Sequence, residues 1–260
     1  MSASSDASST AASPLRQFRA WLAQPPGNEL VRMEQSALGR MLPDLFGYHL
    51  VQVGSMHDAD LLGASRIAHK AIFDLDVAGP GSAAVSMVCS AESLPLAADS
   101  VDVVVLPHVL EFSANPHRVL REMERVLIGD GHLVLTGFNP WSCCGLWRLF
   151  LWWRDEAPWC GHFYGLSRIR DWLALLDLEL LKVTRLFYRP PLRHARALER
   201  LAILEQVGRH AWPFFGGAYV LVAKKRVIPL TSSRVRWGAR RSVITSGLAE
   251  PTARNVQCDR

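Results

Sequence analysis

The sequence lacks any apolar run of the roughly 18 residues that a membrane-spanning helix requires, although hydrophobic residues make up 49% of it. The N-terminal residues, MSASSDASSTAASP, lack the basic and then apolar pattern of a secretion signal. These two absences predict a cytoplasmic protein without a transmembrane segment. The 260 residues are enough for one α/β domain with a substantial core and appended ends.

Cysteine is scarce, and the five residues present are an odd number. Cys143 and Cys144 are adjacent, but no second pair stands at the spacing of a metal site. The composition therefore supports neither a metal centre nor a disulfide framework. We expect reduced, partly buried thiols.

Acidic residues are few near the C-terminus. From Lys224 to Arg260, nine Lys or Arg stand against two acids, whereas the preceding 223 residues hold 20 bases and 22 acids. The net charge of +5 therefore comes from the tail and not from the rest of the chain. Such a tail is usually solvated and mobile. Weak contact with nucleic acid or an anionic membrane surface is the alternative.

Two β-branched, almost uncharged runs flank one amphipathic segment in the middle of the chain. The runs are Val101–Leu106 and His132–Thr136, and the segment between them is Pro116–Leu127. In that segment apolar residues recur at helical spacing, and charged residues fill the opposite face. Continuous apolar strands separated by a helix are typical of a parallel sheet buried on both faces. We therefore predict a βαβ unit here.

The same region resembles a known family. The stretch LPLAADSVDVVVLPHVLEF, followed by LREMERVLIGDGHLVL, is similar to the second half of a class I S-adenosylmethionine-dependent methyltransferase of the type 11 group. The resemblance is dense over about 50 residues and extends over roughly Tyr48–Lys225. GFNPWS is similar to a segment of a proteobacterial subgroup with a reduced first glycine loop. The resemblance implies a Rossmann-like α/β fold, with a mostly parallel seven-stranded sheet and helices on both faces.

The resemblance also implies a chemistry. The cofactor would be S-adenosyl-L-methionine, and its methyl group would pass to an unidentified small-molecule or macromolecular acceptor. The second hypothesis is a non-catalytic binding or regulatory protein that has kept a methyltransferase fold, because a shared fold does not fix function.

The glycine loop that the resemblance implies after the first strand is largely missing. Of three glycines spaced two apart only Gly54 is present, and Met56 and Asp58 hold the other two positions. Gln52 stands where an acid is expected. Small residues are needed because the backbone must pass close to the cofactor's methionine part. In this loop the resemblance assigns cofactor contacts to Gly54 and Ser55.

The other cofactor contacts would follow the second and third strands. The resemblance implies an acid that binds the two ribose hydroxyls, and we prefer Asp74 to Asp76 for this role. Ser90, Ala91 and Glu92 stand where the adenine ring would be bound, with the serine in place of the usual acid. The alternatives are an ordinary turn for the two aspartates and a solvent-facing turn position for Glu92.

His108 directly follows the predicted strand Val101–Leu106 and its proline, and it is the candidate general base. Ligands lie outside the carboxyl ends of parallel strands, so this residue is expected near the methyl group of the cofactor. An imidazole can also titrate near neutrality. A capping or packing role at the start of the next helix is the alternative.

Tryptophan is concentrated after the last parallel strand. Five of the nine tryptophans lie in WSCCGLWRLFLWWRDEAPW, residues 141–159. We define residues 141–160 as the Trp-rich insert. Three roles are expected for it: a lid over an aromatic or lipid-like substrate, a segment lying in a membrane interface, or a core helix that covers the sheet edge. Asn139, Trp141 and Tyr164 are the residues expected to line a substrate pocket.

We divide the chain into three parts. Residues 1–28 are expected to be disordered or weakly ordered, apart from a short helix at Pro14–Ala23. Residues 29–228 form the methyltransferase-like domain, which begins with a helix at Glu29–Leu42. Residues 229–260 form a basic, flexible tail.

Overall fold

The structure, a computed structural model of the chain, describes residues 14–56, 59–75, 85–150, 158–189, 208 and 212–227. All of them belong to one compact unit, Met1–Val227. Asp58, Asp76, residues 151–157 of the Trp-rich insert and the C-terminal tail lie outside the described residues. The expectations for those segments stay predictions.

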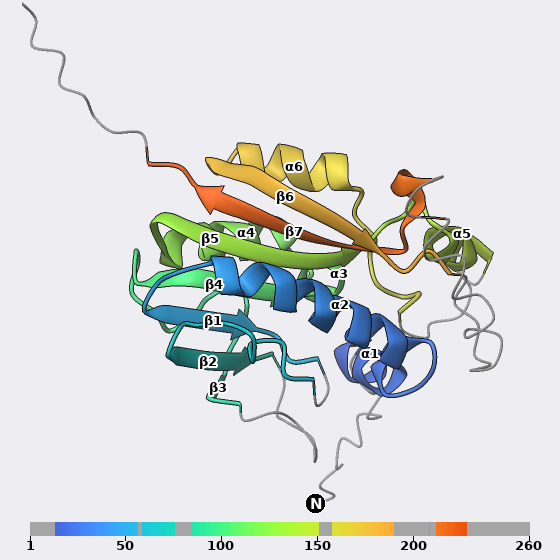
Figure 1. Ribbon diagram of the computed structural model, residues 1–260, viewed down its shortest axis with the longest axis horizontal. Coiled ribbons are helices and arrows are strands. Elements are labelled where there is room, and N and C mark those ends of the chain that lie inside the picture. Colours follow the sequence, from blue (N-terminus) through green and yellow to red (C-terminus); the bar gives the residue numbers. More distant parts are fainter. Residues whose placement is uncertain are drawn as a thin grey trace, which may run out of the picture. The chain divides into compact units, whose positions relative to one another are not determined.

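The described residues form one seven-stranded sheet of order β3-β2-β1-β4-β5-β7-β6 (Figure 1). Strands β1 to β5 are parallel, and β7 runs antiparallel between β5 and β6. This confirms the predicted mostly parallel, Rossmann-like sheet. The strand bounds are β1 His49–Val53, β2 His69–Asp74, β3 Met87–Val88, β4 Val101–Pro107, β5 Leu127–Phe138, β6 Leu178–Leu186 and β7 Ala218–Lys225.

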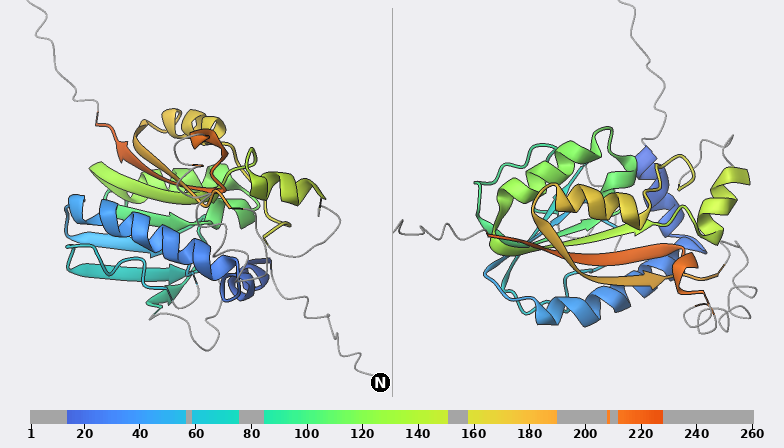
Figure 2. Two further views of the ribbon diagram at one scale, coloured as in Figure 1. Left: turned by 45° about the vertical axis from the view of Figure 1, so that its right-hand side comes forward. Right: turned by 90° about the horizontal axis from the view of Figure 1, so that it is seen from above.

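Helices cover both faces of this sheet (Figure 2). Helices α4 and α6 pack on one face, where their apolar residues join those of β4 and β5, and α1 and α2 pack on the other. The bounds are α1 Pro14–Leu22, α2 Gly27–Met41, α3 Val109–Phe112, α4 Pro116–Val126, α5 Cys143–Phe150 and α6 Leu166–Ala174, with 3₁₀ turns η1 Leu42–Asp44 and η2 Pro213–Phe215.

The central strand β4 shows why its sequence is a continuous apolar run. Val103 and Val105 belong to the core under α1 and α2, whereas Val104 and Leu106 belong to the core under α4 and α6. Successive side chains of a strand point to opposite faces, so a strand covered on both sides needs apolar residues at every position. The βαβ unit β4–α4–β5 is therefore confirmed.

Helix α1 lies within the segment that we expected to be weakly ordered, residues 1–28. Phe18 and Leu22 are each only 2% exposed and belong to the core on the α2 side. The predicted helix at Pro14–Ala23 is confirmed, and the packed unit begins before residue 29. This N-terminal helix reaches the carboxyl ends of the strands, where the site described below lies.

No helix among the described residues is long and apolar enough to cross a membrane. The cytoplasmic location of the protein stays a prediction.

Candidate functional site

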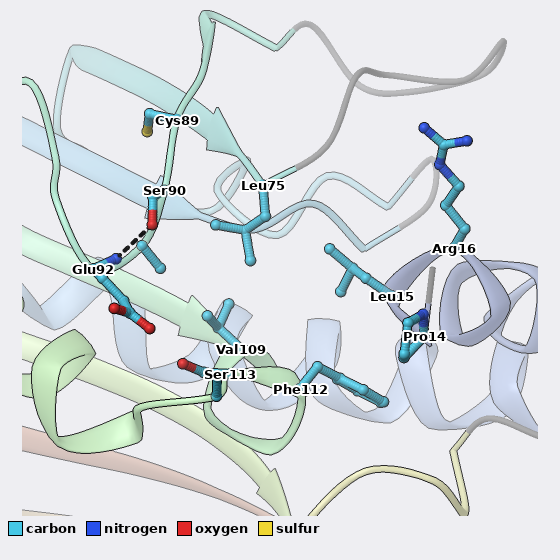
Figure 3. Close-up of a pocket in the computed structure, with 12 residues that line it drawn as sticks. Pro14, Leu15, Arg16, Leu75, Cys89, Ser90, Glu92, Val109, Phe112 and Ser113 are labelled. Carbon is cyan, nitrogen blue, oxygen red and sulfur yellow. Dashed lines mark hydrogen bonds between the residues drawn. The ribbon is translucent and has the colours of Figure 1, made fainter. Parts of the chain in front are cut away.

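A pocket of about 700 Å³ lies at the carboxyl ends of β2 and β3, beside the start of α3 (Figure 3). Its volume is in the range usual for small-molecule sites. The side chains of Leu15, Leu75 and Val109 converge in it. One wall comes from the strand ends and α3, and the other from α1. Its lining residues include Leu75, Ser90, Ala91, Glu92, Val109 and Phe112 on the first wall and Pro14, Leu15 and Arg16 on the second.

The structure brings three of the predicted cofactor residues into this pocket. Ser90 Oγ accepts a hydrogen bond from the Glu92 backbone N–H at 3.2 Å. The Glu92 carboxylate lies 3.4 Å from Arg118 Nη1 and accepts a hydrogen bond of 3.4 Å from Asn115 Nδ2. Ala91 is buried in the pocket wall. Two polar side chains beside apolar walls can bind a flat heteroaromatic ring.

Gly54 follows β1 in a conformation that favours glycine. Its φ is +89°, and a Cβ there would lie 2.7 Å from Val109 Cγ2. Gln52 donates from Nε2 to the Gly54 carbonyl at 2.8 Å, so its side chain braces the turn. Met56 does not enter the pocket, since it is buried in the core on the α2 side. The loop therefore takes a path that removes the methionine from the cofactor region.

Asp74 ends β2 and is fully buried, although it stands in the predicted ribose-binding position. Arg19 Nη2 of α1 forms an ion pair with Asp74 Oδ1. The Leu75 N–H donates to the same oxygen at 2.6 Å, and the Ser55 hydroxyl donates to Oδ2 at 2.7 Å. The structure therefore joins Ser55 and Asp74, two of the predicted cofactor residues, by a hydrogen bond, and it adds an arginine that sequence reasoning missed.

His108 lies at the carboxyl end of β4 with a left-handed backbone, at φ 50° and ψ 21°. Its Nδ1 lies 2.7 Å from Glu111 Oε2, and its Nε2 lies 2.8 Å from Glu34 Oε1 of α2. Phe18 and Phe138 pack against the ring. Glu34, His108 and Glu111 thus form a buried triad, and both carboxylates are further residues that sequence reasoning missed.

The charges in this triad determine the protonation of His108. Burial lowers the pKa of the imidazole, but Glu111 and Glu34 outweigh that effect and raise the pKa to about 10. Both ring nitrogens then donate, and no nitrogen is left to accept a proton. In this arrangement His108 is not placed as a general base. It is a buried cation that joins α2 to the turn between β4 and α3.

The three residues expected to line a substrate pocket do not line this one. Asn139 Nδ2 donates to the carbonyls of Phe214 and Gly216 at 2.8 and 3.1 Å, which ties the end of β5 to the segment before β7. Trp141 is 78% exposed. The ring of Tyr164 packs against Trp172 of α6, with 5.0 Å between ring centroids.

The described residues hold no group of three or more His, Cys, Asp or Glu that could bind a metal ion. The donor set fits S-adenosylmethionine in part. The pocket offers an apolar cleft with Ser90 and Glu92 for the base. Next to Gly54, the buried Gln52 Oε1 has no hydrogen-bond partner among the described residues. Asp74 stands where the resemblance places the ribose-binding acid, but it forms an ion pair with Arg19.

The sheet order, the helices on both faces and a pocket at the carboxyl ends of β2 and β3 define the class I methyltransferase fold. Comparisons with known proteins agree with this assignment of the fold. A family model described as a methyltransferase domain matches residues 64–135, a range that begins after Gly54. The uncharacterized protein YafS of Escherichia coli (strain K12) is 35% identical over 204 residues, which cover 77% of this chain and 79% of YafS.

Solved structures share the fold. One is from a complex of a Haloferax volcanii methyltransferase activator with a methyltransferase, at a TM-score of 0.57 and 16% identity, covering 83% of this chain and 98% of that one. Another is an S-adenosylmethionine-dependent methyltransferase of Thermotoga maritima, at a TM-score of 0.56 and 16% identity, covering 81% and 99%. The chain belongs to the same family as YafS, and its methyltransferase domain and class I methyltransferase fold are those that the resemblance implied.

Proposed function

We propose that this protein is a methyltransferase that binds S-adenosylmethionine at the carboxyl ends of β1 to β4. The observation that carries this proposal is the pocket beside Asp74, with Ser90, Ala91 and Glu92 in its wall. In this proposal the adenine lies against Ser90–Glu92, and the ribose hydroxyls bind the Asp74 carboxylate. Gly54 and Ser55 contact the methionine part.

When bound, the cofactor supplies a sulfonium methyl group for transfer to a nucleophile. The contribution of this chain is then to position the two reactants and to exclude water. Phe112 provides an apolar wall of the pocket, and Phe138 packs on His108 at the end of β4. His108 holds the turn between β4 and α3 in place. An acceptor that must lose a proton would need a base other than the fully paired His108.

The second candidate function is a non-catalytic protein with a methyltransferase fold. The ion pair between Arg19 and Asp74 favours it, because the carboxylate expected to bind the ribose already has a partner. The two candidates differ in whether the chain binds the cofactor at all.

Calorimetric titration with S-adenosylmethionine and S-adenosylhomocysteine separates them. We expect micromolar binding by the wild-type protein and a large loss of affinity in Asp74→Ala. Ser90→Trp is a second variant, since Ser90 is exposed in the pocket wall and a bulky side chain there blocks the cleft without disturbing the core. Glu179→Ala, an exposed acid on β6, is the control and should bind as the wild type does. Absence of binding at millimolar ligand would leave the non-catalytic candidate.

A further inference from the structure

The Asp74 carboxylate cannot accept a bidentate pair of hydrogen bonds in this state, because its Oδ1 already accepts two. Oδ1 receives Arg19 Nη2 and the Leu75 N–H, and Oδ2 receives the Ser55 hydroxyl. Two adjacent hydroxyls need both oxygens of a carboxylate for a bidentate contact. Since Asp74 is fully buried in this state, any ligand that is to bind it must first displace the Arg19 side chain.

Arg19 belongs to a short helix at the start of the packed unit. α1 has nine residues, of which Phe18 and Leu22 are buried. Isolated helices of this length are unstable in water, so α1 depends on its docking. Phe18 packs on Phe112 with ring centroids 4.8 Å apart and on His108 at 5.3 Å. On release, α1 loses these apolar contacts together with the ion pair between Arg19 and Asp74.

The ion pair itself is incomplete on the arginine side. Arg19 Nε is buried, and it has no hydrogen-bond partner among the described residues. A buried N–H of a charged group that lacks an acceptor raises the free energy of the docked state. The contact between Arg19 and Asp74 is therefore less favourable than a fully satisfied buried pair, and a ligand that satisfies Asp74 better can replace it.

The same helix forms one wall of the pocket. Pro14, Leu15 and Arg16 face the pocket, and Arg19, one turn further along, pairs with Asp74. The docked helix thus leaves the cleft beside Ser90 open while it covers the carboxylate. Helix α1 therefore covers Asp74, the residue to which the proposed function assigns the ribose.

We propose that α1 is an autoinhibitory segment, in which Arg19 takes the place of the ribose hydroxyls on Asp74 and must leave before the cofactor binds. This proposal rests on the proposed function, because it assigns the ribose to Asp74. The docked and released states of α1 form a two-state equilibrium, and the cofactor binds only the released state. The apparent dissociation constant is therefore the intrinsic one divided by the released fraction.

The first test compares the affinity for S-adenosylhomocysteine of the wild type, Arg19→Ala and the control Arg32→Ala. Arg32 is an exposed arginine of α2 that pairs only loosely with Glu29. If about a tenth or less of the wild-type molecules are released, Arg19→Ala should bind at least about tenfold more tightly. Arg32→Ala should match the wild type. In an Asp74→Ala background the effect of Arg19→Ala should vanish.

Equal or weaker affinity of Arg19→Ala, with clear binding by the wild type, would overturn the autoinhibitory role and leave the proposed function intact. If neither protein binds the ligand, the proposed function fails, and the inference fails with it. The two failures are therefore distinguishable.

The second test needs no variant and is immune to any folding defect of Arg19→Ala. Hydrogen exchange of the backbone amides of residues 15–24 is measured in the wild-type protein with and without saturating S-adenosylhomocysteine. If α1 is released when the ligand binds, these amides should exchange faster in the bound state. Slower exchange would mean that α1 closes over the ligand, and this result would overturn the proposal.

Discussion

The two halves of the sheet differ in how they are held in the fold. In β4 the four residues Val103–Leu106 are fully buried, and β5 and β7 are buried along most of their length. At the other edge β3 has two residues, both exposed, and β2 begins with two exposed residues, His69 and Lys70. The half with β4, β5 and β7 carries the core, whereas the half with β1 to β3 carries the candidate cofactor site.

This difference links one half of the sheet to stability and the other half to ligand binding. The carboxyl ends of β1 and β2 rely on α1 for cover, because Arg19 neutralises Asp74 and Phe18 packs on the turn after β4. A short helix at the end of a packed unit can open locally at a lower free energy than global unfolding requires. Substitutions in the half with β4, β5 and β7 should therefore change the free energy of unfolding. Substitutions in the half with β1 to β3 should change ligand affinity.

The largest loss of stability is expected where the two halves meet, at the buried triad. Glu34→Ala removes one carboxylate from the His108 cation, and loss of one partner of a buried pair costs about 3–5 kcal/mol. Glu29→Ala on the same helix removes a partly exposed acid whose ion-pair distances are 3.7 Å, and should cost under about 1 kcal/mol. Urea unfolding measures both. Equal losses would show that the triad contributes no special stability.

The same triad predicts a pH dependence. The pKa of His108 in the folded state is raised to about 10, above the value of about 6.5 for an unfolded histidine. Its contribution is therefore fully present below about pH 6.5 and is lost as the pH rises toward 10. Unfolding free energies measured between pH 7 and 9 should fall for the wild type. The fall should be smaller in His108→Gln, and identical slopes would contradict the charged triad.

A direct comparison of the two halves uses one apolar truncation in each. Leu120 of α4 is fully buried against the sheet, so Leu120→Ala should destabilise the protein by about 2–5 kcal/mol. Met87 of β3 is 47% exposed, and Met87→Ala should cost less than about 0.5 kcal/mol. Thermal unfolding of the two variants tests this. A large effect of the β3 variant would remove the distinction between the halves.

The turn after β1 offers a matched pair of glycines. Gly54→Ala places a Cβ 2.7 Å from Val109 Cγ2 at a φ of +89°, and should destabilise by about 1–3 kcal/mol. Gly39 lies inside α2, where the nearest atom to a new Cβ is 3.9 Å away. Gly39→Ala should therefore stabilise the helix by about 0.5–1 kcal/mol. Opposite signs in urea unfolding are the expected result, and a neutral Gly54→Ala would contradict the described loop path.

The last comparison concerns residues that the sequence assigned to a substrate pocket. Asn139→Ala removes two hydrogen bonds to backbone carbonyls and should cost about 1–2 kcal/mol. Trp141→Ala, at an exposed position, should change stability by less than about 0.5 kcal/mol. Affinity for S-adenosylhomocysteine should be unchanged in both. A loss of affinity in Asn139→Ala without a loss of stability would place this residue at the cofactor site, a role that the sequence did not assign to it.

The fold could be predicted because its signals are local. The apolar runs of β4 and β5 and the helical spacing of α4 lie within about 40 consecutive residues, and they coincide with the family resemblance. The position of His108 at the end of β4 followed from the strand end, and that of Asp74 at the end of β2 followed from the family resemblance.

The partners of these residues could not be predicted, because they come from far along the chain. Arg19 is 55 residues from Asp74, and Glu34 is 74 residues from His108. Only tertiary packing brings such groups together. Glu34 nevertheless left a signal, since it lies one turn from Leu30 and Leu38, on the apolar stripe of α2. A charged residue on such a stripe predicts a buried pairing without naming the partner.

The crystal structure of the protein with S-adenosylhomocysteine tests the central claim most directly. We predict that the ribose hydroxyls bind the Asp74 carboxylate, with the Arg19 side chain withdrawn and the base beside Ser90 and Glu92. A ligand bound elsewhere, or bound while Arg19 remains on Asp74, would contradict the account.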